Sequence, residues 1–136
     1  MQLAKIDYAT ADEVTKTRLK VIGDHTRAVT YLISDGVTPS NVGRGYIVRR
    51  LIRRVVRNGR LLGMPTGAFT PKVAEVAVRL SGACDPAVAR NARKVYAELE
   101  REELRFVETL EKGEALLDEF LTAACARCAT GTKVWQ

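Results

Sequence analysis

Apolar residues recur every three to four positions along most of the chain, which is the spacing of one face of an α-helix. The first stripe consists of Ile22, Val29 and Ile33, flanked by Val21, Ala28 and Leu32. It predicts a helix that starts near Thr10 and ends near Ser34. Thr10 and Glu13 have the spacing of a capping box, in which each side chain bonds the other residue's backbone N–H. Gly36 is suited to end this helix in the left-handed conformation.

A second stripe covers residues 47–62 and divides the helix predicted there into two faces. At about 100° per residue, apolar side chains fill one half of the helical wheel: Ile47, Val48, Leu51, Ile52, Val55, Val56 and Leu62. Within an arc of roughly 140° on the other half lie Arg49, Arg50, Arg53, Arg54, Arg57 and Arg60. This helix can therefore dock on a core and still present guanidinium groups. Ser40 or Asn41, in the loop before it, can serve as its N-cap.

A short helix is predicted after the arginine helix. Thr70 followed by Pro71 is typical of an N-cap and the first helical residue, and Gly82 is placed to end the helix after about Leu80. The side chains that we expect to be buried on it are Val73, Val76, Ala77 and Leu80.

A long helix follows, and it completes an all-α pattern. From Asp85-Pro86, which repeats the start signal, apolar residues recur at helical spacing to about Arg127, with Gly113 as a point of bending or interruption. No convincing strand and no internal repeat is found. We predict an all-α bundle of four or five helices with a long C-terminal helix. A single domain over residues 1–136 suits this length, with frayed ends at residues 1–9 and 129–136.

Charge is segregated along the chain, although its net value is only +6. No acidic residue occurs between Asp35 and Glu75, whereas residues 98–119 are predominantly acidic. A run of arginines lies on one helix face, and a polar loop with three glycines at residues 36–45 precedes it. This pattern favours nucleic-acid binding, because the phosphate backbone of a nucleic acid is a polyanion. The alternative is a basic face that is merely solvated, or that pairs with an acidic partner inside or outside the chain.

Candidate catalytic or metal-binding chemistry is sparse. His25, the only histidine, lies on or beside the first stripe, and we expect it to be packed and hydrogen-bonded rather than catalytic. Cys125 and Cys128 have the spacing of half a zinc site, but only Cys84 and His25 remain to complete four ligands, so we predict no metal. No phosphate-binding loop or hydrolase motif occurs, and no catalytic residue is predicted. The odd cysteine count favours a reducing compartment, and we expect neither an export signal nor a membrane span, since no such pattern is visible in the sequence.

One long stretch of this sequence resembles a known family. Residues 24–63, DHTRAVTYLISDGVTPSNVGRGYIVRRLIRRVVRNGRLLG, are similar to the helical segment that follows the catalytic core in alanyl-tRNA synthetases. Residues 102–119, EELRFVETLEKGEALLDE, are similar to the long helix after it, and the resemblance covers about residues 17–119. The family's catalytic core, editing domain and C-terminal domain are missing. The resemblance therefore implies an inactive piece of a larger synthetase, whose parent would use ATP and magnesium, in the cytoplasm, a plastid or a mitochondrion.

The resemblance also implies a partner and a set of binding residues. In the family this segment helps to recognise the acceptor stem of alanine tRNA, whose identity element is a G·U wobble pair. Asn41 stands at the family's wobble-reading asparagine, while Val42 departs from the glutamate or other polar residue usual there. An amide fits this task because the guanine 2-amino group of a wobble pair is exposed in the wide minor groove of RNA.

The resemblance and the arginine run together predict phosphate contacts on the stem. The arginines implied are Arg44, Arg49, Arg50, Arg53, Arg54 and Arg57. Some of them can pair instead with the glutamates of residues 98–119. The alternative function is a helical protein-interaction module whose arginine face docks on an acidic partner.

Overall fold

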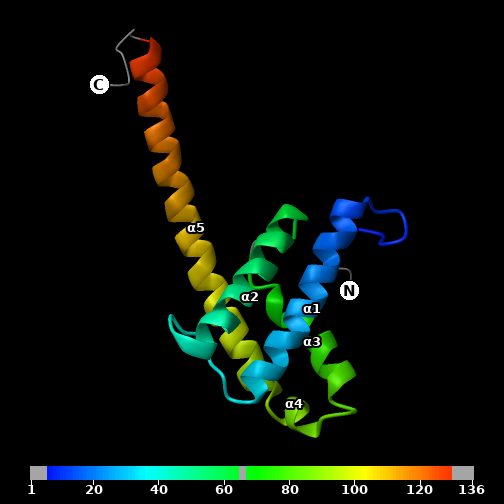
Figure 1. Ribbon diagram of the computed structural model, residues 1–136. Helices are drawn as coiled ribbons and strands as arrows, with labels where there is room; N and C mark the ends of the chain where they lie inside the picture. Colours follow the sequence, from blue (N-terminus) through cyan, green and yellow to red (C-terminus); the bar gives the residue numbers. More distant parts are fainter. Residues whose placement is uncertain (1–5, 65–66, 130–136) are drawn as a thin grey trace. The chain divides into compact units, whose positions relative to one another are not determined.

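The computed structural model of the protein describes residues 6–64 and 67–129, with only the backbone described at 126–129. In this part of the chain there are five α-helices and no strand (Figure 1). They are α1 (Glu13–Ser34), α2 (Gly43–Leu61), α3 (Thr70–Ser81), α4 (Pro86–Arg90) and α5 (Ala92–Ala129). The all-α prediction and the long C-terminal helix are confirmed. Residues 1–5 and 130–136, most of the ends that we expected to fray, lie outside the described residues.

The chain divides into two compact units, Met1–Leu104 and Arg105–Gln136, and α5 contributes residues to both. In the first unit α1 packs against α2, α3 and α4, and α3 packs against α4 (Figure 1). The apolar side chains buried in this unit are Ile22, Val29, Ile33, Val48, Ile52, Val55, Val56, Phe69, Ala74, Val78, Val88, Val95 and Leu99. Each large aliphatic among them contributes about 1.5–3 kcal/mol on burial. The predicted stripe on α1 is confirmed at Ile22, Val29 and Ile33, while Ala28 beside it is exposed.

The two ends of α1 test two sequence predictions. Its N-cap is Asp12, whose Oδ1 accepts from the Thr15 N–H at 3.3 Å, so the capping box that we predicted at Thr10 is wrong. Asp12 is the N-cap because its carboxylate accepts from the third helical N–H and lies at the positive end of the helix dipole. The other end is confirmed, because Gly36 has a φ of 89° and follows the last helical turn. Its N–H bonds the carbonyl of Ile33, as in a Schellman motif.

The rotation of α3 about its own axis differs from the prediction. Its N-cap is Phe69 rather than Thr70, and its buried residues are Thr70, Ala74, Val78 and Ser81. Val76 and Leu80, which we expected in the core, are 45% and 70% exposed, and Val73 and Ala77 are half-buried. Apolar residues surround this short helix, so its hydrophobic pattern alone does not fix which side faces the core.

A carboxylate on α5 fixes the start of α3. Glu103 is 1% exposed and accepts from the backbone N–H groups of Phe69 at 3.1 Å and Thr70 at 2.9 Å, and from the Thr70 hydroxyl at 2.5 Å. These N–H groups belong to the first turn of α3, which has no intrahelical acceptor for them. Glu103 thus caps α3 from another helix and sets the side of α3 that is buried.

The interruption of the C-terminal helical stretch lies at Asn91, not at Gly113 as we predicted. α4 ends at Arg90, and Asn91 Nδ2 donates to the carbonyl and to the hydroxyl of Ser34, at 3.1 and 3.2 Å. These bonds join the end of α4 to the end of α1. α5 continues through Gly113, because a glycine within a helix costs only about 1 kcal/mol relative to alanine. The N-cap predicted at Asp85 is confirmed, since its Oδ1 accepts from the Ala87 N–H at 2.9 Å.

The second unit contains the remainder of α5. Lys112 Nζ lies 2.6 Å from Glu108 Oε1, one turn away on the helix surface. Four large apolar side chains of this part are more than half exposed: Leu116, Leu117, Phe120 and Leu121. Among the described residues, no helix combines the length and the apolar character that crossing a membrane requires.

Candidate nucleic-acid interface

The loop before α2 folds back onto the first turn of that helix. The Ser40 N–H donates to the carbonyl of Gly45 at 3.1 Å, and the Ser40 hydroxyl donates to the carbonyl of Val42 at 2.8 Å. A Cβ at Gly45 would lie 2.2 Å from Ser40 Oγ and 2.4 Å from the Thr38 carbonyl oxygen. Only glycine permits this approach. The loop that carries Asn41 is therefore held close to α2.

Neither of the two predicted caps closes α2. The N-cap is Val42, which makes no side-chain bond to the helix and is 76% exposed. Ser40 bonds the loop backbone, and the Asn41 amide contacts a side chain further along α2. The prediction of an Asn41 or Ser40 cap is wrong because both side chains have other partners. The Asn41 side chain thus makes no capping bond to the backbone of α2.

The amphipathic character of α2 is confirmed with one exception. Its buried residues are Gly45, Val48, Ile52, Val55, Val56 and Gly59. Ile47, at the border of the apolar half, is 49% exposed, contrary to our assignment. Phe69 packs so closely on Gly59 that a Cβ there would lie 2.2 Å from its ring. This contact anchors the last turns of α2 to the segment that leads into α3.

Two of the arginines on α2 face a buried carboxylate of α5. Glu102 is 3% exposed, and its Oε1 lies 2.8 Å from Arg49 Nε and 3.5 Å from Arg53 Nε. Arg49 is 11% exposed and Arg53 39% exposed. A buried carboxylate such as Glu102 can stay ionised when cationic groups lie beside it in this way. The alternative that some arginines pair with the acidic helix is therefore correct for Arg49 and Arg53.

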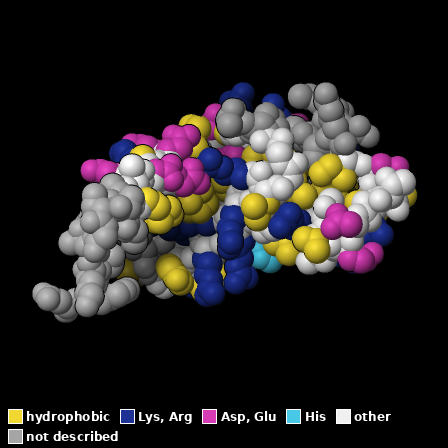
Figure 2. Space-filling model, turned by 90° about the horizontal axis from the view of Figure 1, so that it is seen from above, with side chains coloured by type: hydrophobic (Ala, Val, Ile, Leu, Met, Phe, Trp, Pro, Cys, Tyr) yellow, Lys and Arg dark blue, Asp and Glu magenta, His cyan; other side chains and the backbone are white. Residues whose placement is uncertain are grey.

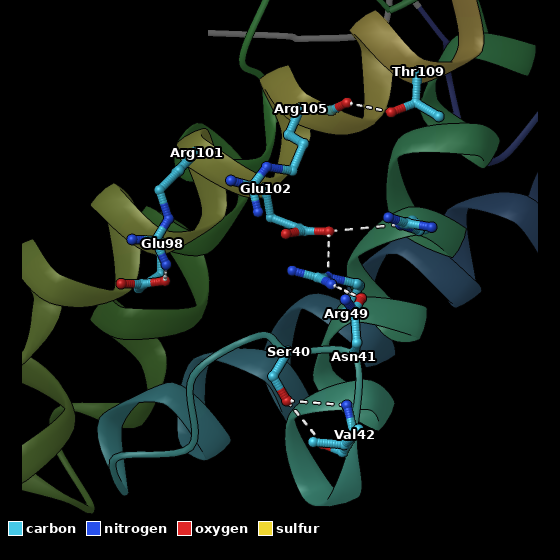
Figure 3. Close-up of polar contacts among 10 residues, drawn as sticks. Ser40, Asn41, Val42, Arg49, Glu98, Arg101, Glu102, Arg105 and Thr109 are labelled. Atoms are coloured by element: carbon cyan, nitrogen blue, oxygen red, sulfur yellow. Dashed lines mark hydrogen bonds and ion pairs between the residues drawn. The ribbon is translucent and has the colours of Figure 1, made fainter. Parts of the chain in front are cut away.

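Arg49 also contacts the candidate base reader. Its Nη1 donates to Asn41 Oδ1, while its Nε faces Glu102 (Figure 3). Figure 3 shows that the three side chains form a row in space, with Glu102 on α5, Arg49 on α2 and Asn41 on the loop. Asn41, at the outer end of this row, is exposed to solvent.

The other predicted arginines point to solvent. Arg44, Arg50, Arg54 and Arg57 are exposed. Within residues 6–64 and 67–125, no carboxylate lies within ion-pair distance of any of these four. Figure 2 shows Lys and Arg side chains gathered into a band on one face, beside the single histidine. The structure thus separates the arginines into a set that pairs with Glu102, Arg49 and Arg53, and an exposed set.

His25 lies at the edge of the exposed set. It is half-buried, but the hydrogen bond that we expected is missing at Nε2, which is buried without a partner among the described residues. Burial lowers the pKa of His25, and the nearby Arg54 guanidinium lowers it further, while Asp24 acts in the opposite direction. A histidine held neutral in this position adds no charge to the arginine face.

Glu102 and Glu103 are the residues of this region that the sequence interpretation did not single out. A signal for them was present. They follow buried Leu99 by three and four positions, so both share its face of α5. Ionisable residues on the apolar stripe of a helix are expected to have a specific partner.

No group of three His, Cys, Asp or Glu side chains suited to a metal ion occurs in the described part of the chain. The side chain of Cys128, part of the CxxC pair, lies outside the described residues, and Cys125 is exposed.

Comparison with known proteins places these features in a family. The family described as tRNA synthetases class II (A) matches residues 1–136. An alanine–tRNA ligase, chloroplastic/mitochondrial, from Micromonas pusilla is 60% identical over 97% of the chain, which covers 15% of that protein. Ligases of the same name from Oryza sativa subsp. indica, and an alanine–tRNA ligase from Trichodesmium erythraeum, are 60% identical over 90% and 88% of the chain. The chain spans 13% and 14% of those two relatives. The chain therefore belongs to the alanyl-tRNA synthetase family of the class II tRNA synthetases.

Proposed function

We propose that this chain is the tRNA-binding segment of an alanine–tRNA ligase, and that it contacts the acceptor stem of alanine tRNA at its G·U wobble pair. One observation carries the proposal. Four arginines, Arg44, Arg50, Arg54 and Arg57, are exposed without a carboxylate partner among the described residues, on the helix that follows the loop with Asn41. Exposed guanidinium groups on one helix attract a nucleic-acid backbone, because that backbone carries a dense series of negative charges.

The two kinds of residue would divide the work of recognition. The exposed arginines would contact phosphates, which fixes the position of the stem without reading its sequence. Asn41 would reach the minor groove, where a wobble pair exposes the guanine 2-amino group. Arg49 and Arg53 are less suited to phosphate binding than the sequence suggested, because both face Glu102.

The reaction of the longer ligase follows from the family. We propose that the parent enzyme attaches alanine to its tRNA in an ATP- and magnesium-dependent reaction, and that this segment supplies tRNA contacts only. The names of the Micromonas and Oryza relatives support a plastid or mitochondrial location for the protein.

A protein-interaction module is the second candidate. Its support is that a carboxylate does dock on this arginine face, since Glu102 pairs with Arg49 and Arg53. An acidic segment of a partner could extend that pairing to the exposed arginines.

Titration of the chain with acceptor minihelices separates the two candidates. The minihelices carry either the G·U pair or a G·C pair, and each is measured at two salt concentrations, with an acidic peptide as competitor. We expect binding that weakens steeply with salt, because released counterions drive it, and tighter binding to the G·U stem. Binding of the acidic peptide with no measurable RNA affinity would support the interaction module instead.

A further inference from the structure

Three side chains connect the interior of the first unit to the candidate base reader. Glu102 Oε1 lies 2.8 Å from Arg49 Nε, and Arg49 Nη1 donates to Asn41 Oδ1 (Figure 3). Glu102 is 3% exposed and Arg49 is 11% exposed, whereas Asn41 is exposed to solvent. A direct phosphate contact does not account for Arg49, because most of this side chain is withdrawn from water.

We propose that Arg49 and Glu102 are positioning residues that act through Asn41, and that they set the preference for the wobble pair rather than the affinity for phosphate. The proposal rests on the proposed role of Asn41 as the base reader. A guanidinium has donors only, so the amide oxygen of Asn41 must face Arg49. Its second lone pair remains to accept from the guanine 2-amino group, and the two Nδ2 donors stay available for a neighbouring oxygen. An unconstrained asparagine samples several rotamers. Arg49 selects one of them before RNA binds, which reduces the ordering cost of binding.

Glu102 makes this arrangement specific to arginine. The guanidinium is planar, and its donors form a rigid fork, so an Nε held by Glu102 determines the direction of Nη1. A lysine at position 49 could keep the ion pair with Glu102. It would have no second donor at a fixed angle, so it would release Asn41.

A double-mutant cycle tests the proposal. Affinities for G·U and G·C acceptor minihelices are measured for the wild-type chain, Arg49→Lys, Asn41→Ala and the double variant. We expect Arg49→Lys to lower the G·U over G·C affinity ratio about fivefold or more, as the loss of a base contact does. In the Asn41→Ala background the same substitution should not change the ratio further, because Arg49 acts through Asn41.

The matched control is Arg101→Lys, which changes an arginine that pairs with Glu98 on the surface of α5. This control should leave the affinity ratio and the melting temperature unchanged. Arg49→Lys should also leave the salt slope nearly unchanged, because Arg49 is not a phosphate contact in this proposal.

The outcomes distinguish this proposal from the function on which it rests. A wild-type chain with no preference for the G·U stem would contradict the role of Asn41. A wild-type preference that survives Arg49→Lys, or that falls equally with and without Asn41, would overturn the positioning role alone. NMR of the RNA-free chain gives an independent test, since the Asn41 side-chain amide should be ordered in the wild type and mobile in Arg49→Lys. Equal mobility in the two proteins would also overturn the proposal.

Discussion

Glu102 and Glu103 show how two neighbouring glutamates are held inside a helical unit by different partners. Glu102 faces guanidinium groups, whereas Glu103 accepts from the backbone at the start of α3. Burial raises the pKa of Glu103, and the hydrogen bonds from Thr70 and Phe69 oppose this shift. For a carboxyl group whose pKa is raised on folding, ionisation weakens the fold. The contribution of its protonated form is therefore lost as the pH rises from the ordinary value to the raised one.

Removal of the Glu103 carboxylate should destabilise the first unit. Glu103→Ala leaves the N–H groups of Phe69 and Thr70 buried without an acceptor, which we expect to lower the free energy of unfolding by about 2–4 kcal/mol. Glu100→Ala is the control, because Glu100 is exposed on the same helix. Urea denaturation measures both. Equal effects of the two substitutions would show that the capping bonds make no net contribution.

His25 should make stability depend on pH near neutrality. Its pKa is lowered from 6.5 in the folded protein, chiefly by burial and then by Arg54. The unfolded chain therefore binds the proton more readily. The stability from neutral His25 is fully present above its ordinary pKa and is lost as the pH falls through the lowered one. We expect the unfolding free energy to decrease on acidification from about pH 7.5 to about pH 5.5.

A substitution isolates the contribution of His25 to this pH dependence. In His25→Phe, which keeps a ring but cannot titrate, the decrease over the same pH interval should be smaller. Denaturant melts at several pH values measure the difference. An identical pH profile in the two proteins would assign the effect to other groups.

The arginine arc of α2 contains two functionally different edges. One edge, Arg49 and Arg53, faces Glu102 on α5, and the other, at Arg54, lies beside His25 on α1. Arg50 and Arg57, between these edges, are exposed. A helical wheel places all of these side chains on one arc, but the neighbouring helices decide which guanidinium groups remain available to a ligand.

Two paired substitutions should separate these roles. Arg50→Gln with Arg57→Gln should flatten the log–log salt dependence of minihelix binding by roughly one unit per lost phosphate contact, with little change in melting temperature. Arg49→Gln with Arg53→Gln should instead lower the melting temperature, because Glu102 would remain as a buried charge without its partners. Salt-independent binding by the wild type, or equal melting losses in both pairs, would contradict this division.

The sequence predicted elements better than it predicted their ends and contacts. The all-α fold, the long C-terminal helix and the two faces of α2 follow from periodicity, whereas the break between α4 and α5 at Asn91 does not. Periodicity failed on α3, where Val76 and Leu80 are as apolar as the residues that are actually buried. It also failed at Asn41, whose partner Arg49 depends on a loop geometry that Gly45 permits. Contacts between distant segments, such as Glu103 with Thr70, produce no periodic pattern in the sequence, so periodicity cannot predict them.

At the scale of the whole chain, the acidic and basic segments are complementary only in part. The beginning of the acidic segment neutralises one edge of the arginine arc through Glu102, whereas Arg50, Arg54 and Arg57 of the same helix are exposed. The protein thus combines an internally paired edge of α2 with exposed positive charge on the same helix. It belongs to the alanyl-tRNA synthetase family and spans 15% of the length of the Micromonas ligase.

We expect the chain to be catalytically inactive by itself. It should not support alanine-dependent exchange of pyrophosphate into ATP, because it spans only 13–15% of the ligases to which it is similar. The assay compares it with the Trichodesmium ligase as a positive control. Exchange above the buffer background by the purified chain would contradict the prediction.

The cap that Glu103 places on α3 imposes an order on biosynthesis. A ribosome releases the chain from its N-terminus, and Glu103 lies 33 and 34 positions after the two backbone groups that it accepts from. Until α5 emerges, the start of α3 has only water to bond, and Arg49 has no Glu102 beside it. The nascent helices can form and collapse loosely before then. The contact between Arg49 and Asn41 would take its final form only once the first turns of α5 have left the exit tunnel, so translation speed over the codons that follow residue 104 would govern when this contact forms.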